Sequence, residues 1–455
     1  MTDRSFDVVI IGAGPAGEVS AGRLANGGLE VALVEQHLVG GECSFYACMP
    51  SKALLRPGQV LAEARRVPGA AEAVTGELDV ERVFERRDAA AHHFSDAEQL
   101  PWIEERGIAL MRGHGRLASE RVVQVGDETL TARRAVIIAT GTKAAIPPIP
   151  GLREARPWTN REATTAHEAP DSLIVLGAGT SGIELADAYA SLGTEVTVIE
   201  AAPRILGREE PFAGEQVSAA LADRGVAVRV GTKATAVRRA DGRVTVEVED
   251  GSSVSADEIL VAVGRQPHTD DLGVDTLGLE PGKPIEVDDT LRVPGHDWLY
   301  AIGDVNGRVL LTHMGKYQGR LVAARILGRE LPLRSDGPLS PRVTFTEPQV
   351  AAVGHTLASA QEAGIDARAV DVPTGGNPGG SFVGKGAPGT ARIVVDEQRR
   401  VIVGATFTGV EVAEAIHAAT IAVIAEVSLD DLWHAVPCFP TRSELWLKLL
   451  EAYGM

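Results

Sequence analysis

The sequence is poor in cysteine, in long apolar runs and in positive charge. Its 455 residues include three cysteines, too few for a secreted fold held together by disulfides. No stretch approaches the roughly 18 apolar residues of a membrane span, and the apolar run Val8–Ile11 is too short for a signal peptide. A formal net charge of −18 opposes binding to nucleic acids and to anionic membranes. We therefore expect a cytoplasmic protein that binds neither.

The remaining composition is that of an ordinary globular protein. Hydrophobic residues make up 44% of the chain and charged residues 23%. A chain of this length usually forms more than one domain, so we expect roughly two to four. Domains of this size bury a sufficient core without cross-links.

The first motif is a glycine-rich turn between an apolar strand and a helix. Asp7–Ile11 predicts a buried strand, and residues 12–17 read Gly-Ala-Gly-Pro-Ala-Gly. A helical pattern follows, and a second predicted strand, Val31–Val34, ends at Glu35. This order of strand, turn, helix, strand and acid is the context that supports a dinucleotide-binding motif.

Each glycine of this turn has its own role in such a motif. Gly12 permits the tight turn, Gly14 lets the backbone approach a pyrophosphate, and Gly17 lets helix and strand pack closely. The helix N-terminus favours the phosphate charge. Glu35 is placed to accept hydrogen bonds from the ribose hydroxyls.

The same arrangement recurs in the middle of the chain. Ser172–Leu176 predicts a strand, residues 177–182 repeat the glycine pattern, and the strand Glu195–Ile199 ends at Glu200. The glycines of this second turn are Gly177, Gly179 and Gly182. Two complete units predict two bound dinucleotides.

Glu200 bears on which nicotinamide the second unit takes. A carboxylate binds a free 2′-hydroxyl and repels a 2′-phosphate, so we expect NAD(H) in preference to NADP(H). Arg204 and Arg208 follow closely. They either soften this preference or are solvated surface charges.

Two of the cysteines lie between the two units, in the segment Gly-Gly-Glu-Cys-Ser-Phe-Tyr-Ala-Cys-Met-Pro-Ser-Lys. On a regular helix, a spacing of five turns the side chain of Cys48 about 140° from that of Cys43. A disulfide between them therefore requires a distorted helical turn. Structural zinc needs about four closely spaced ligands, and the chain has no second cysteine pair, so we expect no metal site. A thiol pair beside a flavin fits better, with Lys52 favouring a thiolate.

These motifs resemble those of the class I pyridine nucleotide–disulfide oxidoreductases, whose members include dihydrolipoamide dehydrogenase, glutathione reductase and mercuric reductase. The resemblance covers nearly the whole chain. Further matching segments are Ala-Thr-Gly at 139–141, Val-Gly-Arg at 263–265, Tyr-Ala-Ile-Gly-Asp-Val at 300–305, Leu-Thr-His-Met at 311–314 and Phe-Thr-Glu-Pro at 345–348.

The resemblance implies an α/β fold with two Rossmann-like dinucleotide-binding domains and a C-terminal α+β dimerisation domain. It implies FAD on residues 1–150 and 270–335, and NAD(P)H on residues 151–269. Residues 336–455 would form the interface of a homodimer.

The resemblance also implies roles for single residues. Cys48 would be the charge-transfer thiol against the flavin, and Cys43 the interchange thiol that meets the substrate. Lys52 and Glu184 would lie near the flavin N5 and the nicotinamide. The implied FAD-binding residues are Gly12, Gly14, Gly17, Glu35, Gly41, Ala139, Thr140, Gly141, Gly303, Asp304, His313 and Met314. The implied NAD-binding residues are Gly177, Gly179, Gly182, Glu200 and Gly264.

The C-terminal motif departs from the family. In dihydrolipoamide dehydrogenase it reads His-Pro-Thr-x-Ser-Glu, and the histidine is the acid–base. Here Phe439 replaces that histidine, whereas the orienting acid Glu444 remains. A positioned acid–base is worth typically ~10²–10⁴-fold, so efficient exchange with a dithiol is in doubt. The matching His-Pro bond is cis in the family, and we predict a cis peptide before Pro440.

Other departures surround the cysteines. Cys438 immediately precedes the altered motif; it is either a third thiol for exchange or soft-metal binding, or a buried structural thiol. Glu42 stands where the family usually has threonine; if it lies close to Cys43 and is desolvated, we expect it to raise the pKa of Cys43. His434 and Tyr46 are either substitute proton donors or ordinary surface and packing residues.

We therefore expect hydride to pass from NADH through FAD to the cysteine pair and then to a small acceptor. A small disulfide suits the thiol pair. A quinone, dye or soft-metal acceptor suits the absent histidine, because it needs less proton donation. A redox-sensing or complex-docked flavoprotein without turnover is the alternative of another class, although intact Lys52, Glu184 and both cysteines argue against lost chemistry.

Overall fold

The computed structural model describes residues 2–455, which form two compact units built from interleaved segments. The first unit comprises the chain up to Pro50 together with Asp88–Ala145 and Gly264–Gly337. The second comprises Ser51–Arg87, Ile146–Val263 and Pro338–Met455. In these described residues, no helix combines the length and the apolar character that crossing a bilayer requires.

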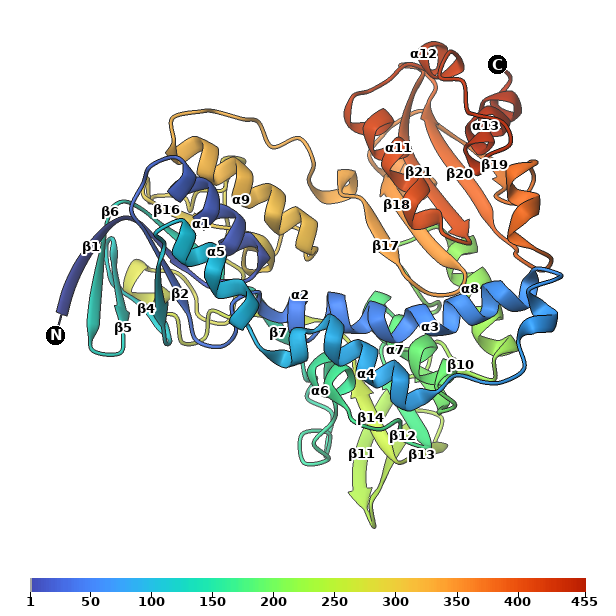
Figure 1. Cartoon of the computed structure of the whole chain (residues 1–455), viewed down its shortest axis with the longest axis horizontal. Helices are drawn as coiled ribbons and strands as arrows, with labels where there is room; N and C mark the ends of the chain where they lie inside the picture. The colour runs from blue at the N-terminus through green and yellow to red at the C-terminus, as the bar shows by residue number, and fades with distance from the viewer. Residues whose placement is uncertain (1) are drawn as a thin grey trace. The chain divides into compact units, whose positions relative to one another are not determined.

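The first unit is a sheet with helices packed on one face (Figure 1). Its strands are β1 (Thr2–Ile11), β2 (Val31–Glu35), β3 (Ala109–Arg112), β4 (Gly115–Ser119), β5 (Val122–Val125), β6 (Glu128–Ile138), β7 (Thr142–Ala144), β15 (Arg265–Pro267) and β16 (Leu299–Ala301). Its helices are α1 (Pro15–Asn26), α2 (Gly41–Phe45), α5 (Leu100–Glu105) and α9 (Thr312–Ile326). The helices α3 (Cys48–Arg66) and α4 (Val80–Ala90) each include a boundary between the units.

The main sheet of this unit has the strand order β3-β2-β1-β6-β5-β4, and β16 also pairs with β6. Strands β3, β2, β1, β6 and β16 pair in parallel, so their carboxyl ends lie along one edge. Every residue of β2 is buried, as expected for a strand covered on both faces. Helices α1 and α9 pack on each other, and the glycine turn after β1 opens at the carboxyl edge.

The second unit contains three sheets. Its strands are β8 (Ser172–Leu176), β9 (Glu195–Ile199), β10 (Ala227–Arg229), β11 (Ala234–Ala240), β12 (Arg243–Val248), β13 (Ser253–Ala256), β14 (Glu258–Val261), β17 (Arg342–Thr344), β18 (Gln349–Gly354), β19 (Ala367–Pro373), β20 (Thr390–Asp396) and β21 (Val401–Gly409). Its helices are α6 (Asn160–Thr165), α7 (Thr180–Ser191), α8 (Pro211–Asp223), α10 (Leu357–Glu362), α11 (Val412–Ile424), α12 (Leu429–Trp433) and α13 (Leu445–Tyr453).

The parallel sheet β10-β9-β8-β14 repeats the strand–turn–helix arrangement of the first unit. The antiparallel sheet β11-β12-β13 lies within the same stretch of chain. The last part forms the antiparallel sheet β17-β18-β21-β20-β19, whose apolar residues share one core with those of α11 and α13.

The expected α/β fold with two Rossmann-like units and a C-terminal α+β region is confirmed. One boundary differs from the expectation: β1 begins at Thr2 rather than Asp7, because its first residues pair with β6 from Glu128 onward. This polar segment has no apolar pattern, so its pairing with β6 gives no signal in the sequence.

Candidate active site

Each glycine-rich turn begins with a glycine that no other residue can replace without strain. Gly12 has φ +105°, and a Cβ added to it would lie 2.4 Å from the Ala139 carbonyl oxygen. Gly177 has φ +100°, and its added Cβ would lie 2.6 Å from the Ala262 carbonyl oxygen. In both units, the turn is thus pressed against the end of a neighbouring parallel strand.

The remaining glycines of the turns differ in their surroundings. A Cβ at Gly17 would lie 1.9 Å from the Gly12 carbonyl oxygen, and one at Gly182 would lie 2.1 Å from that of Gly177. A Cβ at Gly14 or Gly179 would meet no atom within 4 Å. The open space beside these middle glycines, at a helix N-terminus, fits the approach of a pyrophosphate.

The two acids at the strand ends are held in the same way. Glu35 accepts hydrogen bonds from the backbone N–H groups of Ala13 (2.9 Å) and His37 (2.7 Å). Glu200 accepts from the N–H groups of Ala178 (2.6 Å) and Ala202 (2.7 Å). Each carboxylate is therefore oriented at the turn by its own backbone and keeps further lone pairs for ribose hydroxyls. Both sites fit a dinucleotide.

The cysteine segment has the distortion that the spacing requires. Helix α2 ends at Phe45, Tyr46 has φ −133°, and α3 begins at Cys48. Cys43 therefore lies on one short helix and Cys48 at the start of the next. Both are in the thiol form in this structure.

The two thiols share hydrogen bonds with each other and with the first residue of α9. Cys48 Sγ lies 3.2 Å from the hydroxyl oxygen of Thr312. The hydrogen bond to Cys48, burial and the charge of Cys48 raise the pKa of the Cys43 thiol, and Thr312 and Lys316 oppose this rise. The raised pKa of Cys43 favours a proton on this thiol.

Two charged residues that lie close to the cysteines in sequence each have an ion-pair partner. Lys52 forms an ion pair of 2.6 Å with the buried Glu184, which also accepts a hydrogen bond from the Phe345 N–H (2.8 Å). For Cys43, the cation among the leading causes that lower the pKa is Lys316. The expectation that Lys52 favours a thiolate stays a prediction.

Glu42 is the second of these neighbours, and it is bound to an arginine. Arg265 donates to Glu42 Oε2 at 2.5 Å and to the Thr142 carbonyl oxygen at 2.7 Å. The Thr142 hydroxyl in turn donates to Asp304 Oδ2 at 3.0 Å. The leading causes of the raised pKa of Cys43 are Cys48 and burial, and the expected effect of Glu42 on it stays a prediction.

The other residues expected at the flavin lie at the same carboxyl edge of the first sheet. Burial raises the pKa of Asp304, against the hydrogen bond from Thr142 and the charge of Arg265. The Thr140 hydroxyl donates to the His268 carbonyl oxygen at 3.0 Å. Four further residues were expected to contact FAD. Gly141 and Gly303 follow strands and have φ +67° and φ +73°; His313 and Met314 lie at the start of α9, where His313 is exposed and Met314 is buried. Gly41 has φ +61°, and an added Cβ would lie 2.9 Å from Gly14 Cα.

Gly264 follows β14 closely and has φ +152°, with open space where a Cβ would stand. Gly264 follows the strand against which the second glycine turn is pressed, as Gly141 follows the corresponding strand at the first turn. The first unit in fact contains Gly264, because the division between the two units falls just before it.

The C-terminal motif is exposed in the single chain. Phe439 is 74% exposed and Cys438 is exposed, so the alternative of a buried structural thiol does not describe this chain by itself. The Phe439–Pro440 peptide is cis, as predicted. Among the described residues, Oε2 of Glu444 is buried and has no hydrogen-bond partner. His434 is exposed, and Tyr46 stacks on an aromatic ring at 6.2 Å.

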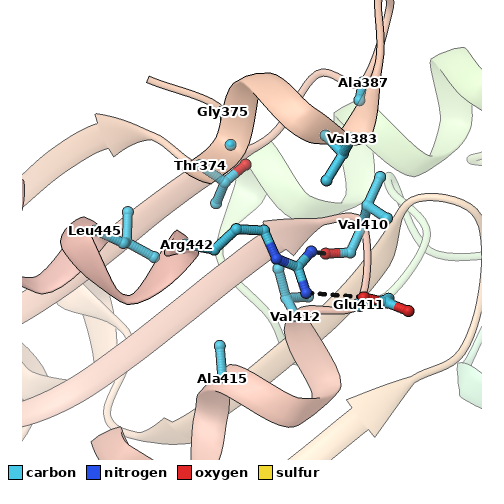
Figure 2. Close-up of a pocket in the computed structure, with 11 residues that line it drawn as sticks. Thr374, Gly375, Val383, Ala387, Val410, Glu411, Val412, Ala415, Arg442 and Leu445 are labelled. Carbon is cyan, nitrogen blue, oxygen red and sulfur yellow. Dashed lines mark hydrogen bonds and ion pairs between the residues drawn. The ribbon is translucent and has the colours of Figure 1, made fainter. Parts of the chain in front are cut away.

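A small cavity lies beside this motif (Figure 2). Arg442 points into it and donates to the Val410 carbonyl oxygen (2.5 Å) and to Glu411 (2.9 Å). The cavity has a volume of about 40 Å³, which suits a few water molecules and no cofactor. Arg442 therefore fastens the motif to the end of β21.

Sequence reasoning missed four side chains that the fold brings to the thiol pair or its surroundings. They are Glu18, Thr312, Lys316 and Arg265. Thr312 belongs to a matched segment, and Lys316 follows it by four residues, a spacing that places both on one helix face. Arg265 likewise belongs to the matched segment 263–265, whereas no signal in the sequence indicated Glu18.

Two glycine turns with oriented acids and a thiol pair at the same edge as the first turn define a flavin- and nicotinamide-dependent oxidoreductase. Residues 6–319 match the profile of the pyridine nucleotide-disulphide oxidoreductases, and residues 340–449 match the dimerisation domain of the same family. The chain belongs to this family and is an FAD-dependent pyridine nucleotide–disulfide oxidoreductase.

Named relatives agree with this assignment. A mercuric reductase of Staphylococcus aureus is 31% identical over 97% of this chain and 81% of its own length. A dihydrolipoyl dehydrogenase of Rhizobium etli is 32% identical over 99% of this chain and 98% of its own. Among solved structures, the Cu(II) complex of the HOCl-induced flavoprotein disulfide reductase RclA from Escherichia coli has a TM-score of 0.86 at 26% identity, covering 98% of this chain and 99% of that one.

Proposed function

We propose that this enzyme passes electrons from NADH through FAD to the Cys43–Cys48 pair and from there to a small disulfide. FAD would occupy residues 1–150 and 270–335, the nicotinamide dinucleotide residues 151–269, and a homodimer interface residues 336–455. The observation that carries the proposal is the hydrogen-bonded thiol pair, in which the bond to Cys48 and burial raise the pKa of Cys43. That asymmetry gives the two sulfurs different tasks.

Gly14, Glu35 and Asp304 would hold the flavin, which when bound accepts hydride from the nicotinamide and delivers two electrons to the thiol pair. The chain's own sulfurs perform the exchange. Cys43 loses its proton and attacks the acceptor disulfide; a Cys43–acceptor bond forms, and the departing thiolate takes up a proton. Cys48 then attacks Cys43, restoring their disulfide and releasing the second thiol. One NADH and one proton thus reduce one disulfide to two thiols.

Lys52 and Glu184 would act beside this exchange as a fixed ion pair. Glu184 is 3% exposed and is held by both Lys52 and the Phe345 N–H. A buried carboxylate with these partners keeps the ammonium group in one position. The Lys52 charge would stabilise the reduced, anionic form of the flavin, and Glu184 would balance that charge when the flavin is oxidised.

The oriented carboxylate of Glu200 supports NADH as the donor. Its two backbone partners hold it at the strand end, where it would accept from a 2′-hydroxyl and repel a 2′-phosphate. Arg204 donates to the carbonyl oxygens of Glu209 (2.8 Å) and Gly207 (2.7 Å), so its terminal nitrogens are engaged within the loop. This arrangement favours a nucleotide without the extra phosphate.

Glu200→Gln is expected to reduce the preference for NADH. The substitution removes the charge and one of the acceptor oxygens, and a hydrogen bond to a charged group is worth about 1.5–3 kcal/mol. We expect the ratio of kcat/KM for NADH to that for NADPH to fall by roughly 10-fold or more, measured by steady-state kinetics. Glu35→Gln is the matched control in the other unit: it should weaken FAD retention and leave the ratio unchanged. An unaltered ratio in Glu200→Gln would contradict this assignment.

The dimer would bring the exposed C-terminal segment into contact with a partner. Val436 is 83% exposed and Phe439 74% exposed in the single chain. Exposed apolar side chains grouped in this way are typical of protein interfaces. The match of residues 340–449 to the family's dimerisation domain supports a second copy as that partner.

The experiment that tests the proposed function is a count of thiols before and after NADH. Anaerobic holoenzyme in its oxidised form should expose one thiol on unfolding, Cys438, and three after NADH addition, since the chain has three cysteines. The matched variant Cys438→Ser should show none and then two. A count that NADH does not change would refute the electron route, whatever acceptor is present.

A second candidate is the reduction of a soft metal ion, and specific observations favour it. Cys438 is exposed, and Phe439 supplies no proton for a leaving thiolate. Thiolates are preferred ligands of Cu(I) and other soft ions. The RclA structure at 26% identity is a Cu(II) complex, and a mercuric reductase is 31% identical. One NADH would reduce two Cu(II) ions to Cu(I), or one Hg(II) ion to the metal.

A panel of acceptors in steady-state NADH oxidation separates the two candidates. Small disulfides should support turnover that needs both Cys43 and Cys48 but not Cys438. Turnover with Cu(II) or Hg(II) that falls in Cys438→Ser, while disulfide reduction is preserved, would instead favour the soft-metal function. Thiols that appear with NADH but turn over no acceptor would indicate a sensor.

A further inference from the structure

Three consecutive residues between α4 and α5 have a left-handed backbone. His92, His93 and Phe94 have φ of +49°, +50° and +56°. Residues other than glycine seldom adopt this conformation, and three in succession are rarer still, because each Cβ crowds the backbone. Such a turn persists only where the surrounding structure holds it, and strained backbone of this kind is concentrated at functional sites. The contacts around the turn therefore indicate what it does.

The turn places a phenylalanine against the segment between the two cysteines. The ring of Phe94 stacks on that of Tyr46, with the centroids 6.2 Å apart and an angle of 14° between the planes. Tyr46 follows the last residue of α2, and the break between α2 and α3 lies at its backbone. Phe94 therefore contacts the residue that separates the helix of Cys43 from the helix of Cys48.

A buried carboxylate two residues further along holds the other end of α2. Asp96 Oδ2 accepts hydrogen bonds from the backbone N–H of Val39 at 2.8 Å and from Arg112 at 2.7 Å. Val39 lies two residues before the start of α2. Arg112 also donates to the His37 carbonyl oxygen at 2.9 Å, and this second bond keeps the Asp96 carboxylate in place. Segment 92–96 thus contacts the chain on both sides of α2.

The position of α2 decides whether the two cysteines can bond. A disulfide needs the two Cα atoms roughly 4.4–6.8 Å apart. Pro50 favours a helix that begins near Cys48, because proline is tolerated in a first turn and not in a helix interior, but it does not set the direction of α2. Helix α2 has five residues, and a helix this short is not stable by itself. Its place beside Cys48 therefore depends on contacts with the rest of the fold.

We propose that Phe94 and Asp96 are positioning residues, which hold α2 where Cys43 and Cys48 can form and re-form their disulfide. The inference rests on the proposed function of the cysteine pair. Phe94 holds the end of α2 and Asp96 its start, and the strained turn is retained because it supplies both contacts. Bond formation between the two sulfurs releases two electrons and two protons, which convert the acceptor disulfide to two thiols.

The stability of this disulfide can be measured without turnover. Holoenzyme is equilibrated in mixtures of reduced and oxidised dithiothreitol and quenched with acid. The free thiols are then alkylated, and the peptide that holds Cys43 and Cys48 is weighed by mass spectrometry. The fraction oxidised at each mixture gives the equilibrium constant for disulfide formation, which reports how well the fold brings the two sulfurs together.

Phe94→Ala should lower this equilibrium constant by about two- to tenfold, the range that a stacked aromatic pair contributes. Asp96→Asn should lower it by a similar factor, because a neutral oxygen accepts a weaker hydrogen bond than a carboxylate. Neither effect should be larger, since the ion pair between Glu42 and Arg265 also holds α2. Phe94→Tyr keeps the ring and should have the wild-type constant.

Phe382→Ala is the control, because it removes an exposed aromatic ring from the second unit and should leave the constant unchanged. FAD content and Tm are measured for every variant, and Phe94→Leu takes the place of Phe94→Ala if the latter loses FAD. A constant that is the same in wild type, the Phe94 variant without an aromatic ring and Asp96→Asn would overturn the inference, even if Tm falls. A lowered constant that Phe94→Tyr shares would also overturn it. Failure of the proposed function looks different: the constants would shift as described, but NADH would create no thiols in the wild type.

Discussion

Cys48→Ser is expected to lower NADH-dependent disulfide reduction by roughly 10³-fold or more, because removal of a covalent participant leaves no substitute path. The same loss is expected for Cys43→Ser. Steady-state kinetics with a small disulfide measures both. Cys438→Ser is the matched control, since it removes the third thiol of the chain and should keep disulfide turnover within about twofold.

The two serine variants should differ in their spectra although both lose turnover. The pKa of Cys43 is raised, mainly by its hydrogen bond to Cys48, so the negative charge of the reduced pair belongs on Cys48. Cys43→Ser should therefore show a thiolate-to-flavin charge-transfer absorbance without added reductant, and Cys48→Ser should show none. The opposite pattern would exchange the proposed roles of the two cysteines.

Gly17→Ala is expected to prevent the first glycine turn from forming. The added Cβ would lie 1.9 Å from the Gly12 carbonyl oxygen, and backbone cannot move aside as a flexible side chain can. A cost of about 3 kcal/mol corresponds to a loss of roughly 6–12 °C in Tm for a domain of this size. Thermal unfolding of the flavin-free protein measures it directly.

Gly14→Ala is the companion variant and should behave in the opposite way. Gly14 has φ −74°, which alanine adopts readily, and no atom lies within 4 Å of the added Cβ. The Tm of the flavin-free protein should therefore stay within about 1 °C of wild type. FAD affinity should fall by roughly 10²-fold, because the methyl group fills the space of the pyrophosphate. Equal FAD content in wild type and Gly14→Ala would show that the pyrophosphate does not lie there.

The local motifs could be predicted from the sequence because their physical requirements are local. A tight turn with a backbone carbonyl pressed against it requires glycine, and Gly12 and Gly177 meet that requirement in the same way. A disulfide between Cys43 and Cys48 likewise required a distorted turn, and the structure has a break in the helix at Tyr46. These inferences use the geometry of a few neighbouring residues.

The electrostatics of the thiol pair could not be predicted, because the residues that control it are distant in sequence. Thr312 lies 264 positions from Cys48, and Arg265 lies 223 positions from Glu42. The sequence indicated nearby charges instead, Lys52 for a thiolate of the pair and Glu42 for Cys43. Both turn out to have other partners, since the fold and not the spacing decides which charges meet.

Glu35 and Glu200 each keep two backbone partners from their own turn, independently of any nucleotide. Without a bound cofactor, the carboxylates at both strand ends therefore keep hydrogen-bond partners, and cofactor binding has only to displace water there. Removal of FAD should thus be reversible, because the binding turn keeps its conformation and the protein does not unfold.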